Sequence, residues 1–145
     1  MSTATLALLF AMLVTGAIPL VLLWFMGRIR LPMLAAKSIR IKDIALSRDA
    51  WPEHEKRVSN AFDNQFQIPI LFYLVAFMTL YLGVTWVEAG LGLLFTVSRI
   101  AHAAIFAINN NVVRRFWAFA AGYALIVLWF IELIVRLFAI ALSGV

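Results

Sequence analysis

The stretch Arg57–Tyr73, RVSNAFDNQFQIPILFY, begins with charged and amide side chains and continues without a break into an apolar run. If the stretch forms one helix, four of its polar residues fall at positions i, i+3, i+7 and i+10 and project from one face. These four residues, the polar stripe, are Arg57, Asn60, Asn64 and Gln67. Lipid cannot hydrogen-bond amides or a guanidinium, so the polar stripe must face other protein or a ligand. The pattern predicts a helix that enters a membrane.

The composition supports this prediction. Of the 145 residues, 65% are hydrophobic and 13% are charged, and the mean hydropathy is +0.99. Soluble domains are roughly half apolar and a quarter charged. We therefore predict an all-α integral membrane protein, with residues 1–145 forming one membrane domain. The net charge of +5 does not indicate a nucleic-acid partner, because the basic residues flank apolar runs.

The residue types also exclude several kinds of site. The chain has no cysteine, which excludes disulfides, thiolate metal sites and a protein thiol nucleophile. Its two histidines, His54 and His102, are far apart in the sequence. We expect no metal site.

Four apolar segments are long enough to cross a bilayer, which requires about 20 residues in each helix. The expected helices cover residues of about 5–27, 50–86, 89–109 and 115–142. Asp49 is the expected cap of the second helix, which should start in water near residue 50, enter lipid around Asn64 and bend at Pro69. Glu88 marks a very short turn before the third helix. These segments predict a four-helix bundle.

The basic residues indicate how the chain is oriented. Ten of the twelve Lys and Arg residues lie in the connections after the first and third spans, on one side of the membrane. The positive-inside rule places this basic side in the cytoplasm. Both termini are then expected outside the cytoplasm, and the protein is expected in the cell inner membrane.

Three charged residues are expected near the opposite surface. Glu132 and Arg136 are four residues apart in the favourable acid-first order. At about 1.5 Å per residue, Arg136 and Glu88 lie at similar depth. A neutralised structural cluster explains all three residues, and we do not predict a site there.

Arg99 is expected about 15 Å deep, ten residues before Asn109. An arginine at that depth is costly, which favours a functional role. His102 lies one turn closer to the basic side, on the same face. Two structural alternatives remain open: Arg99 ties helices together by bonding to Gln67 or to backbone carbonyls, and His102 is a packing residue with its hydrogen bonds satisfied.

The polar stripe also has a structural alternative. Asn and Gln can join membrane helices by hydrogen bonds, and Arg57 could extend to lipid headgroups. A purely structural stripe would not require a basic residue at its mouth together with a buried arginine on the next helix. Both features favour an anionic polar ligand that enters from the cytoplasmic side.

The chain resembles the MAPEG family, the membrane-associated proteins of eicosanoid and glutathione metabolism, and in particular its bacterial-type members. The resemblance rests on the length, the four spans, the long basic first connection and the pattern R-x-x-N-x-x-x-N-Q-F-Q-I-P from Arg57 to Pro69. It continues in Arg99-x-x-His102, the Asn-rich turn after it and Arg114. It covers nearly the whole chain. Where family members often carry a glutamate near the proline, this chain has Gln67.

The resemblance implies a homotrimer that binds glutathione between helices two and three of neighbouring subunits, near the cytoplasmic face. Lipophilic substrates would arrive from the membrane lipid. By position, Arg57, Asn60 and Asn64 would contact the carboxylates and peptide groups of glutathione. Gln67, His102 and Arg114 would complete the binding site. His102 stands where many members have a tyrosine.

Two functions follow as hypotheses. In the first, the protein is a glutathione transferase or peroxidase-like enzyme, in which the charge of Arg99 raises the thiolate fraction of glutathione. The thiolate would attack a lipophilic electrophile or reduce a lipid hydroperoxide. In the second, the protein has the same fold without catalysis and binds a lipid or serves as a structural or regulatory membrane subunit. A small transporter or channel is a more distant alternative.

Overall fold

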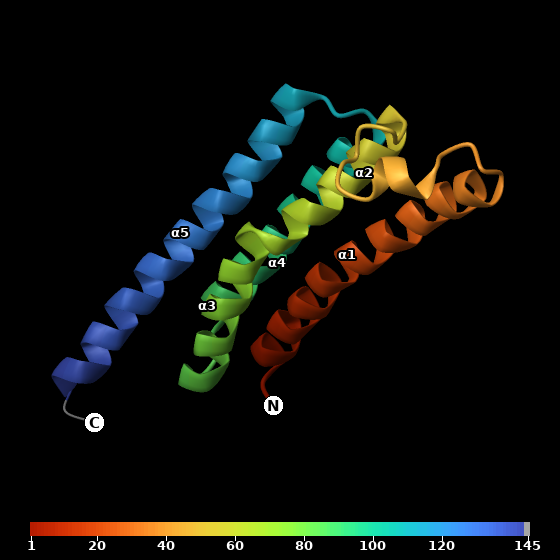
Figure 1. Cartoon of the computed structure of the whole chain (residues 1–145). Helices are drawn as coiled ribbons and strands as arrows, with labels where there is room; N and C mark the ends of the chain where they lie inside the picture. Colours follow the sequence, from red (N-terminus) through yellow and green to blue (C-terminus); the bar gives the residue numbers. More distant parts are fainter. Residues whose placement is uncertain (144–145) are drawn as a thin grey trace.

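The computed structural model describes residues 1–143 as a bundle of long helices (Figure 1). The α-helices are α1 (Thr3–Ala35), α2 (Glu53–Asp63), α3 (Ile68–Leu82), α4 (Trp86–Ile108) and α5 (Val112–Ser143). Two short 3-10 turns, η1 (Ile41–Ile44) and η2 (Asn64–Phe66), precede and follow α2. Helices α2 and α3 together make one apolar span, Glu53–Leu82, so four candidate membrane spans are present within the described residues. The chain is an all-helical, integral multi-pass membrane protein.

Helix α1 is longer than the sequence indicated, because it continues past residue 27 to Ala35. Arg30, in this extra part, donates from Nε to Oε1 of Glu55 in α2 at 2.6 Å, so tertiary contacts hold the additional turns. The helix ends where Lys37 adopts a positive φ of 54°. The N–H of Lys37 then donates to Leu34 O and that of Ser38 to Met33 O, a Schellman arrangement.

The second helix, predicted over about 50–86 with a bend at Pro69, differs from the prediction at both ends and is interrupted beside the predicted bend. Asp49 is not the helix cap: it hydrogen-bonds Ser47, and α2 starts after Pro52. Gln67, with φ −105° and ψ −101°, interrupts the helix between α2 and α3. Pro69 explains this break, because a proline lacks an N–H and its ring clashes with the preceding helical turn. The helix ends at Leu82, before Gly83 with its positive φ of 93°.

The turn between α3 and α4 contains the predicted structural cluster. Glu88 lies inside α4, where its carboxylate accepts from the Thr85 N–H in a capping box. Its other oxygen pairs with Arg136 Nη1 at 2.8 Å, and Arg136 Nη2 donates to Leu82 O at 2.7 Å. The acid partner of Arg136 is therefore Glu88 of a neighbouring helix rather than Glu132 of its own. This arrangement neutralises the arginine and fastens α5 to the turn.

Helix α4 lies centrally and packs against α1, α2 and α5. The main core contains a stacked pair, Phe72 and Phe95, with ring centroids 4.7 Å apart. Trp129 of α5 packs against Phe72 and donates to Thr79 Oγ1 at 3.0 Å. A second cluster near the basic end joins α1, α2 and α4 and consists of Leu22, Met26, Val58, Ala61, Ala103 and Phe106.

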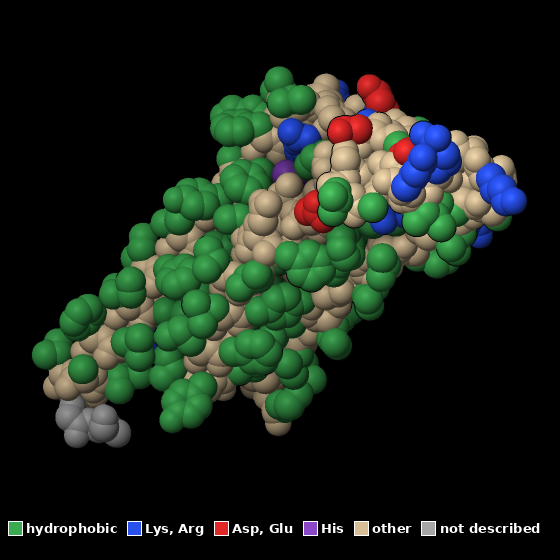
Figure 2. Space-filling view, viewed as in Figure 1, with side chains coloured by type: hydrophobic (Ala, Val, Ile, Leu, Met, Phe, Trp, Pro, Cys, Tyr) green, Lys and Arg blue, Asp and Glu red, His purple; other side chains and the backbone are tan. Residues whose placement is uncertain are grey.

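The two ends of the bundle differ in charge. The N-terminal end of α1 and the C-terminal end of α5 lie at the end that also holds the α3–α4 turn, whereas the α1–α2 and α4–α5 connections lie at the other end (Figure 1). The blue and red side chains visible in Figure 2 gather at that second end, and the rest of that face is almost entirely hydrophobic. The two basic connections therefore lie at the same end of the bundle, because two spans separate them along the chain.

Candidate functional site

Two adjoining depressions open between α2, α4 and α5 at the basic end. The outer depression, of about 300 Å³, is lined by Glu53, Lys56, Arg57, Asn60, Phe106, Asn109 and Asn110. The inner depression, of about 320 Å³, is lined by Asn64, Gln67, His102, Phe106, Val112, Arg115, Phe116 and Phe119. Phe106 borders both. All four residues of the polar stripe therefore face this region, even though the helix that carries them is broken at Gln67.

Arg57 forms the mouth of the outer depression. Its Nη2 pairs with Glu53 Oε2 at 3.0 Å, one helical turn away. Its Nη1 donates to the carbonyl of Ile108 at 3.4 Å, at the C-terminal end of α4. A cation is favourable beside the last carbonyls of a helix because of the helix dipole. Arg57 is thus held toward α4 by these two contacts.

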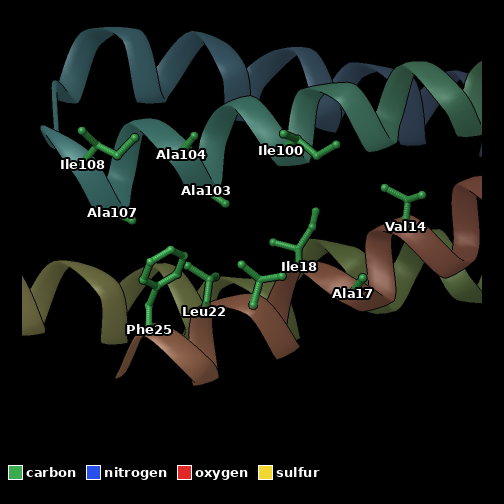
Figure 3. A pocket seen from close by; sticks show the side chains of 11 residues that line it. Val14, Ala17, Ile18, Leu22, Phe25, Ile100, Ala103, Ala104, Ala107 and Ile108 are labelled. Carbon is green, nitrogen blue, oxygen red and sulfur yellow. The ribbon is translucent and has the colours of Figure 1, made fainter. Parts of the chain in front are cut away.

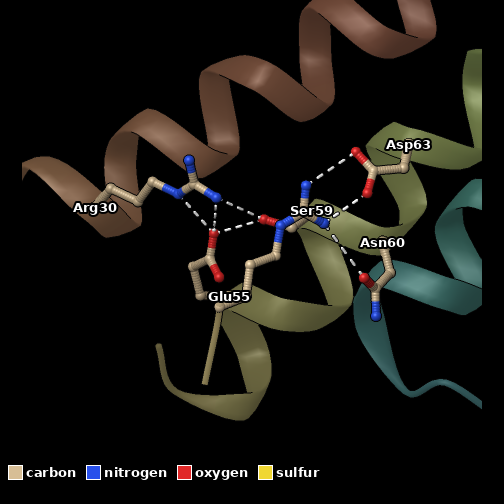
Figure 4. Close-up of polar contacts among 6 residues, drawn as sticks. Arg30, Glu55, Ser59, Asn60 and Asp63 are labelled. Atoms are coloured by element: carbon tan, nitrogen blue, oxygen red, sulfur yellow. Dashed lines mark hydrogen bonds and ion pairs between the residues drawn. The ribbon is translucent and has the colours of Figure 1, made fainter. Parts of the chain in front are cut away.

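Asn60 is joined to the first connection. Its Oδ1 accepts from Arg48 Nη1 at 3.5 Å, and Arg48 also forms an ion pair with Asp63 at 2.6 Å (Figure 4). The hydrogen bond to Asp63 raises the pKa of the Arg48 guanidinium above its ordinary value. The connection therefore presents a permanently charged arginine beside the stripe.

His102 lies between aromatic rings at the inner depression. Its side chain is 3% exposed, and Phe106 and Phe119 flank its ring at centroid distances of 6.0 and 5.9 Å. Its Nδ1 lies 3.2 Å from the carbonyl oxygen of Arg115, which can only accept, so Nδ1 carries the hydrogen. Nε2 is buried and has no partner. The interpretation of His102 as a fully satisfied packing residue therefore accounts for only one of its two nitrogens.

Arg99 lies deeper, one turn from His102, and lines neither depression. It is 1% exposed, and its Nη2 donates to the carbonyl of Asn64 at 3.2 Å. Asn64 caps the end of α2, where carbonyls lack intrahelical partners. This contact is the one expected if Arg99 ties two helices together. The Nε of Arg99 is buried without a partner.

The two arginines that begin α5 have different positions. Arg114 is exposed, and its side chain lines neither depression. Arg115 lines the inner depression, with its guanidinium 4.0 Å from the centroid of the Phe106 ring and with a hydrogen bond to Asn110 Oδ1. Sequence reasoning missed Arg115. Helical periodicity could have indicated this residue, because Arg115 lies seven residues before Gly122 and therefore on the buried face of α5.

Within residues 1–143, no group of three or more potential metal ligands is present. The lining of the depressions instead combines two arginines, a lysine, several amides and an unpartnered histidine nitrogen. Arginines bind carboxylates, and amides bind peptide groups. This donor set fits a small anionic peptide.

Comparison with protein families agrees with the fold and the resemblance. The sequence model of the MAPEG family matches residues 8–135. The chain belongs to the MAPEG family. Neither the curated proteins nor the solved structures that were compared contain a match to the chain.

The MAPEG family includes glutathione-dependent transferases and peroxidases, and its members typically use glutathione. Glutathione is a tripeptide with two carboxylates and a thiol. The arginines, amides and unpartnered histidine nitrogen at the basic end of this MAPEG chain are suited to those groups.

Proposed function

We propose that this protein is a membrane-bound glutathione-dependent transferase or peroxidase-like enzyme that acts on lipophilic electrophiles. The observation that carries the proposal is the pair of depressions that share Phe106 and collect the four stripe residues with His102 and Arg115. Membership of the MAPEG family, whose members typically use glutathione, supports glutathione as the thiol. Glutathione would be the cosubstrate, and the second substrate would come from the membrane.

The outer depression is proposed to hold the carboxylates of glutathione. Arg57 and Lys56 contribute positive charge there, and Asn60 and Asn109 offer amides for the peptide groups. Arg57 is 32% exposed on its side chain and remains accessible to a ligand despite its contact with Glu53. Glu53 is 86% exposed and can turn into solvent when a ligand carboxylate replaces it.

The inner depression is proposed to hold the thiol. Arg115 brings a cation to this depression, which lowers the pKa of a bound thiol from about 8.5 and raises its thiolate fraction. The unpartnered Nε2 of His102 can accept the thiol proton. Arg99 adds a second buried positive charge behind Asn64. In a conjugation, sulfur would bond to the electrophilic carbon of the substrate, and the electron pair would leave with the displaced group.

We further propose that three chains assemble and that neighbouring subunits complete the site, with the basic end in the cytoplasm. The support is family membership together with the openness of both depressions at the surface of one chain. The exposed apolar side chains along α5, among them Leu128, Ile131 and Val135, suit either lipid or another subunit. Lipophilic substrates could reach the thiol along such a surface.

Equilibrium binding of glutathione to the detergent-purified protein tests the proposed function. Saturable binding at millimolar or tighter affinity is expected, and truncation of one charge-assisted contact should weaken it by at least about tenfold, since such contacts contribute about 1.5–3 kcal/mol. Arg57→Ala and Arg115→Ala are expected to lose this binding. Calorimetric titration measures the affinities.

Arg114→Ala is the matched control for Arg115→Ala, because it removes a neighbouring arginine that lines neither depression. The resemblance assigned Arg114 to the site, and the geometry favours Arg115. Loss of binding in Arg114→Ala alone would reverse that choice. Absence of glutathione binding in the unmutated protein would overturn the proposal.

The non-catalytic alternative has two observations in its favour. Arg99 is bound to a backbone carbonyl inside the chain, and Gln67 places a neutral amide where a carboxylate would anchor a cation. Both features suit a bundle that is held together without chemistry. Failure of glutathione binding would therefore direct attention to a lipid that copurifies with the protein.

A further inference from the structure

An apolar groove runs between α1 and α4. The α4 residues that line this groove differ from those that line the candidate site. The candidate site is lined by His102 and Phe106 of α4 and by Asn109, the C-cap of that helix. The groove is lined by other positions of α4, including Ile100, Ala103 and Ala107. At about 3.6 residues per turn these two sets project from opposite faces of the helix. The groove is therefore a feature that the proposed glutathione chemistry does not use.

The lining of the groove is entirely apolar (Figure 3). Alanines of both helices leave room between them, and larger side chains form the walls. The residues that define its shape are Ala17, Ile18, Phe25, Ile100, Ala104 and Ala107. Phe25 and Ile108 lie at one end of the view and Val14 toward the other, so the groove follows the helix axes.

The length of the groove matches that of a hydrocarbon chain in one leaflet. From Val14 to Phe25 it extends about 16 Å at about 1.5 Å per residue. One leaflet of a bilayer has a hydrocarbon depth of about 15 Å, half of about 30 Å. The groove has a volume of about 380 Å³.

The basic end of the groove leads to an arginine without a carboxylate partner. Val14, Ile18, Val21, Phe25 and Arg28 are spaced four, three, four and three residues apart, so they share one face of α1. Within residues 1–143, Arg28 has no ion pair, unlike Arg30 two residues later.

Trp24 supports the guanidinium of Arg28. The guanidinium carbon lies 5.1 Å from the centre of the Trp24 ring. Tryptophan is enriched at the level of lipid headgroups, and arginine binds phosphate well. The end of the groove therefore places a free cation at headgroup level.

We propose that this groove binds one acyl chain of an anionic phospholipid from the leaflet on the basic side, with the lipid phosphate at Arg28. The apolar stretch matches the depth of that leaflet, and Arg28 complements the phosphate. A net negative headgroup is favoured because this end of the protein carries ten of the twelve Lys and Arg residues. The proposal does not depend on glutathione binding.

Native mass spectrometry of the purified protein tests the site, with phosphatidylglycerol and phosphatidylcholine of identical acyl chains as probes. The unmutated protein is expected to retain one phosphatidylglycerol per chain in preference to phosphatidylcholine. Arg28→Gln should reduce this preference about fivefold, corresponding to about 1 kcal/mol for one cation near a membrane surface. Lys42→Gln, which removes another exposed cation of the same end, should leave the preference unchanged.

A variant that fills the groove tests binding of the acyl chain separately from binding of the headgroup. Ala104 is exposed and lines the groove, so Ala104→Phe should occupy the groove and abolish retention of both lipids. Ala121→Phe on α5 is the matched control, because Ala121 is exposed outside the groove, and it should retain the lipid. Equal retention of both lipids by the unmutated protein, or retention unchanged in Ala104→Phe, would overturn the proposal. So would an Ala104→Phe variant that loses subunits while keeping its lipid, because a second chain would then occupy the groove.

Discussion

Arg99 and His102 show that neighbouring polar residues on one helix can have different surroundings. Both are almost completely buried, at 1% and 3% exposure. His102 borders the inner depression, whereas Arg99 reaches the Asn64 carbonyl below it. Each keeps one buried nitrogen without a partner, and such atoms are costly unless a ligand or water satisfies them. The Nε2 atom of His102, which borders the inner depression, is therefore available to a ligand or a water molecule.

Substitution of Arg99 distinguishes a chemical from a structural role. If its charge supports the thiolate, Arg99→Ala should lower kcat/KM for conjugation of glutathione to a chlorodinitrobenzene by about 100-fold, as for loss of a preorganised donor. The oligomer should remain intact in native mass spectra. Arg99→Lys, which keeps the charge, should recover part of the activity. Dissociation of the oligomer in Arg99→Ala would instead identify Arg99 as a structural tie.

At the scale of elements, α1 and α2 are fastened together at their basic ends. Glu55 is completely buried, and its Oε1 accepts from Arg30 Nε at 2.6 Å and from Ser59 Oγ at 2.6 Å. Arg30 also donates to Ser59 Oγ at 2.8 Å (Figure 4). Its guanidinium carbon lies 5.1 Å from the Trp51 ring centre. These contacts explain why α1 remains helical beyond the predicted end of the span.

Removing the positive charge of Arg30 should destabilise the bundle. Arg30→Gln leaves Glu55 as a buried carboxylate without its ion-pair partner, which costs about 3 kcal/mol. A lower midpoint of thermal unfolding in detergent would report this cost. Arg40→Gln, which breaks the exposed pair with Asp43, is the control and should leave the midpoint nearly unchanged. Equal midpoints for the two variants would contradict the assigned role of Arg30.

The break at Gln67 is the other decisive feature at this scale. It divides the second span into α2 and α3, and Asn64 is the C-cap of α2. The Asn64 carbonyl is therefore available to Arg99, while the Asn64 side chain lines the inner depression. An uninterrupted helix would have directed that carbonyl to the N–H four residues later.

At the scale of the whole molecule, α4 separates two surfaces of opposite chemistry. Its residues line the polar depressions with α2 and α5, and the apolar groove with α1. The N-terminal end of α1 and the C-terminal end of α5 lie opposite the basic connections (Figure 1). Under the two proposals, polar ligands bind at the basic end and apolar ligands bind on the lipid-facing sides.

The absence of cysteine allows a direct test of orientation. Ser2→Cys and Ser38→Cys each introduce a single thiol, one near the N-terminus and one in the basic connection. In intact spheroplasts, a membrane-impermeant maleimide should label the first variant and not the second, because the basic side is expected in the cytoplasm. Labelling of both should follow membrane disruption. The reverse pattern in intact spheroplasts would show the opposite orientation.

Much of the architecture could be predicted from the sequence because it depends on local properties. Apolar run length determines which segments can cross a bilayer, and the positions of Lys and Arg indicate a common basic side. That the four residues of the polar stripe project from one side of the helix could be predicted, because residues three or four apart share a helix face. In the structure all four line the two depressions.

The tertiary structure decided which of these residues meet. Whether Arg114 or Arg115 turns inward depends on the rotation of α5, which packing around Trp129 and Gly122 sets far along the helix. The partner of Arg99 is a backbone carbonyl made available by the break at Gln67, and side-chain patterns do not record backbone acceptors. The sequence by itself determined the four spans, the polar stripe and the family. The long-range packing of α4 against its neighbours determined the two depressions and the apolar groove, because helix rotation and a backbone break are not local properties of any one segment.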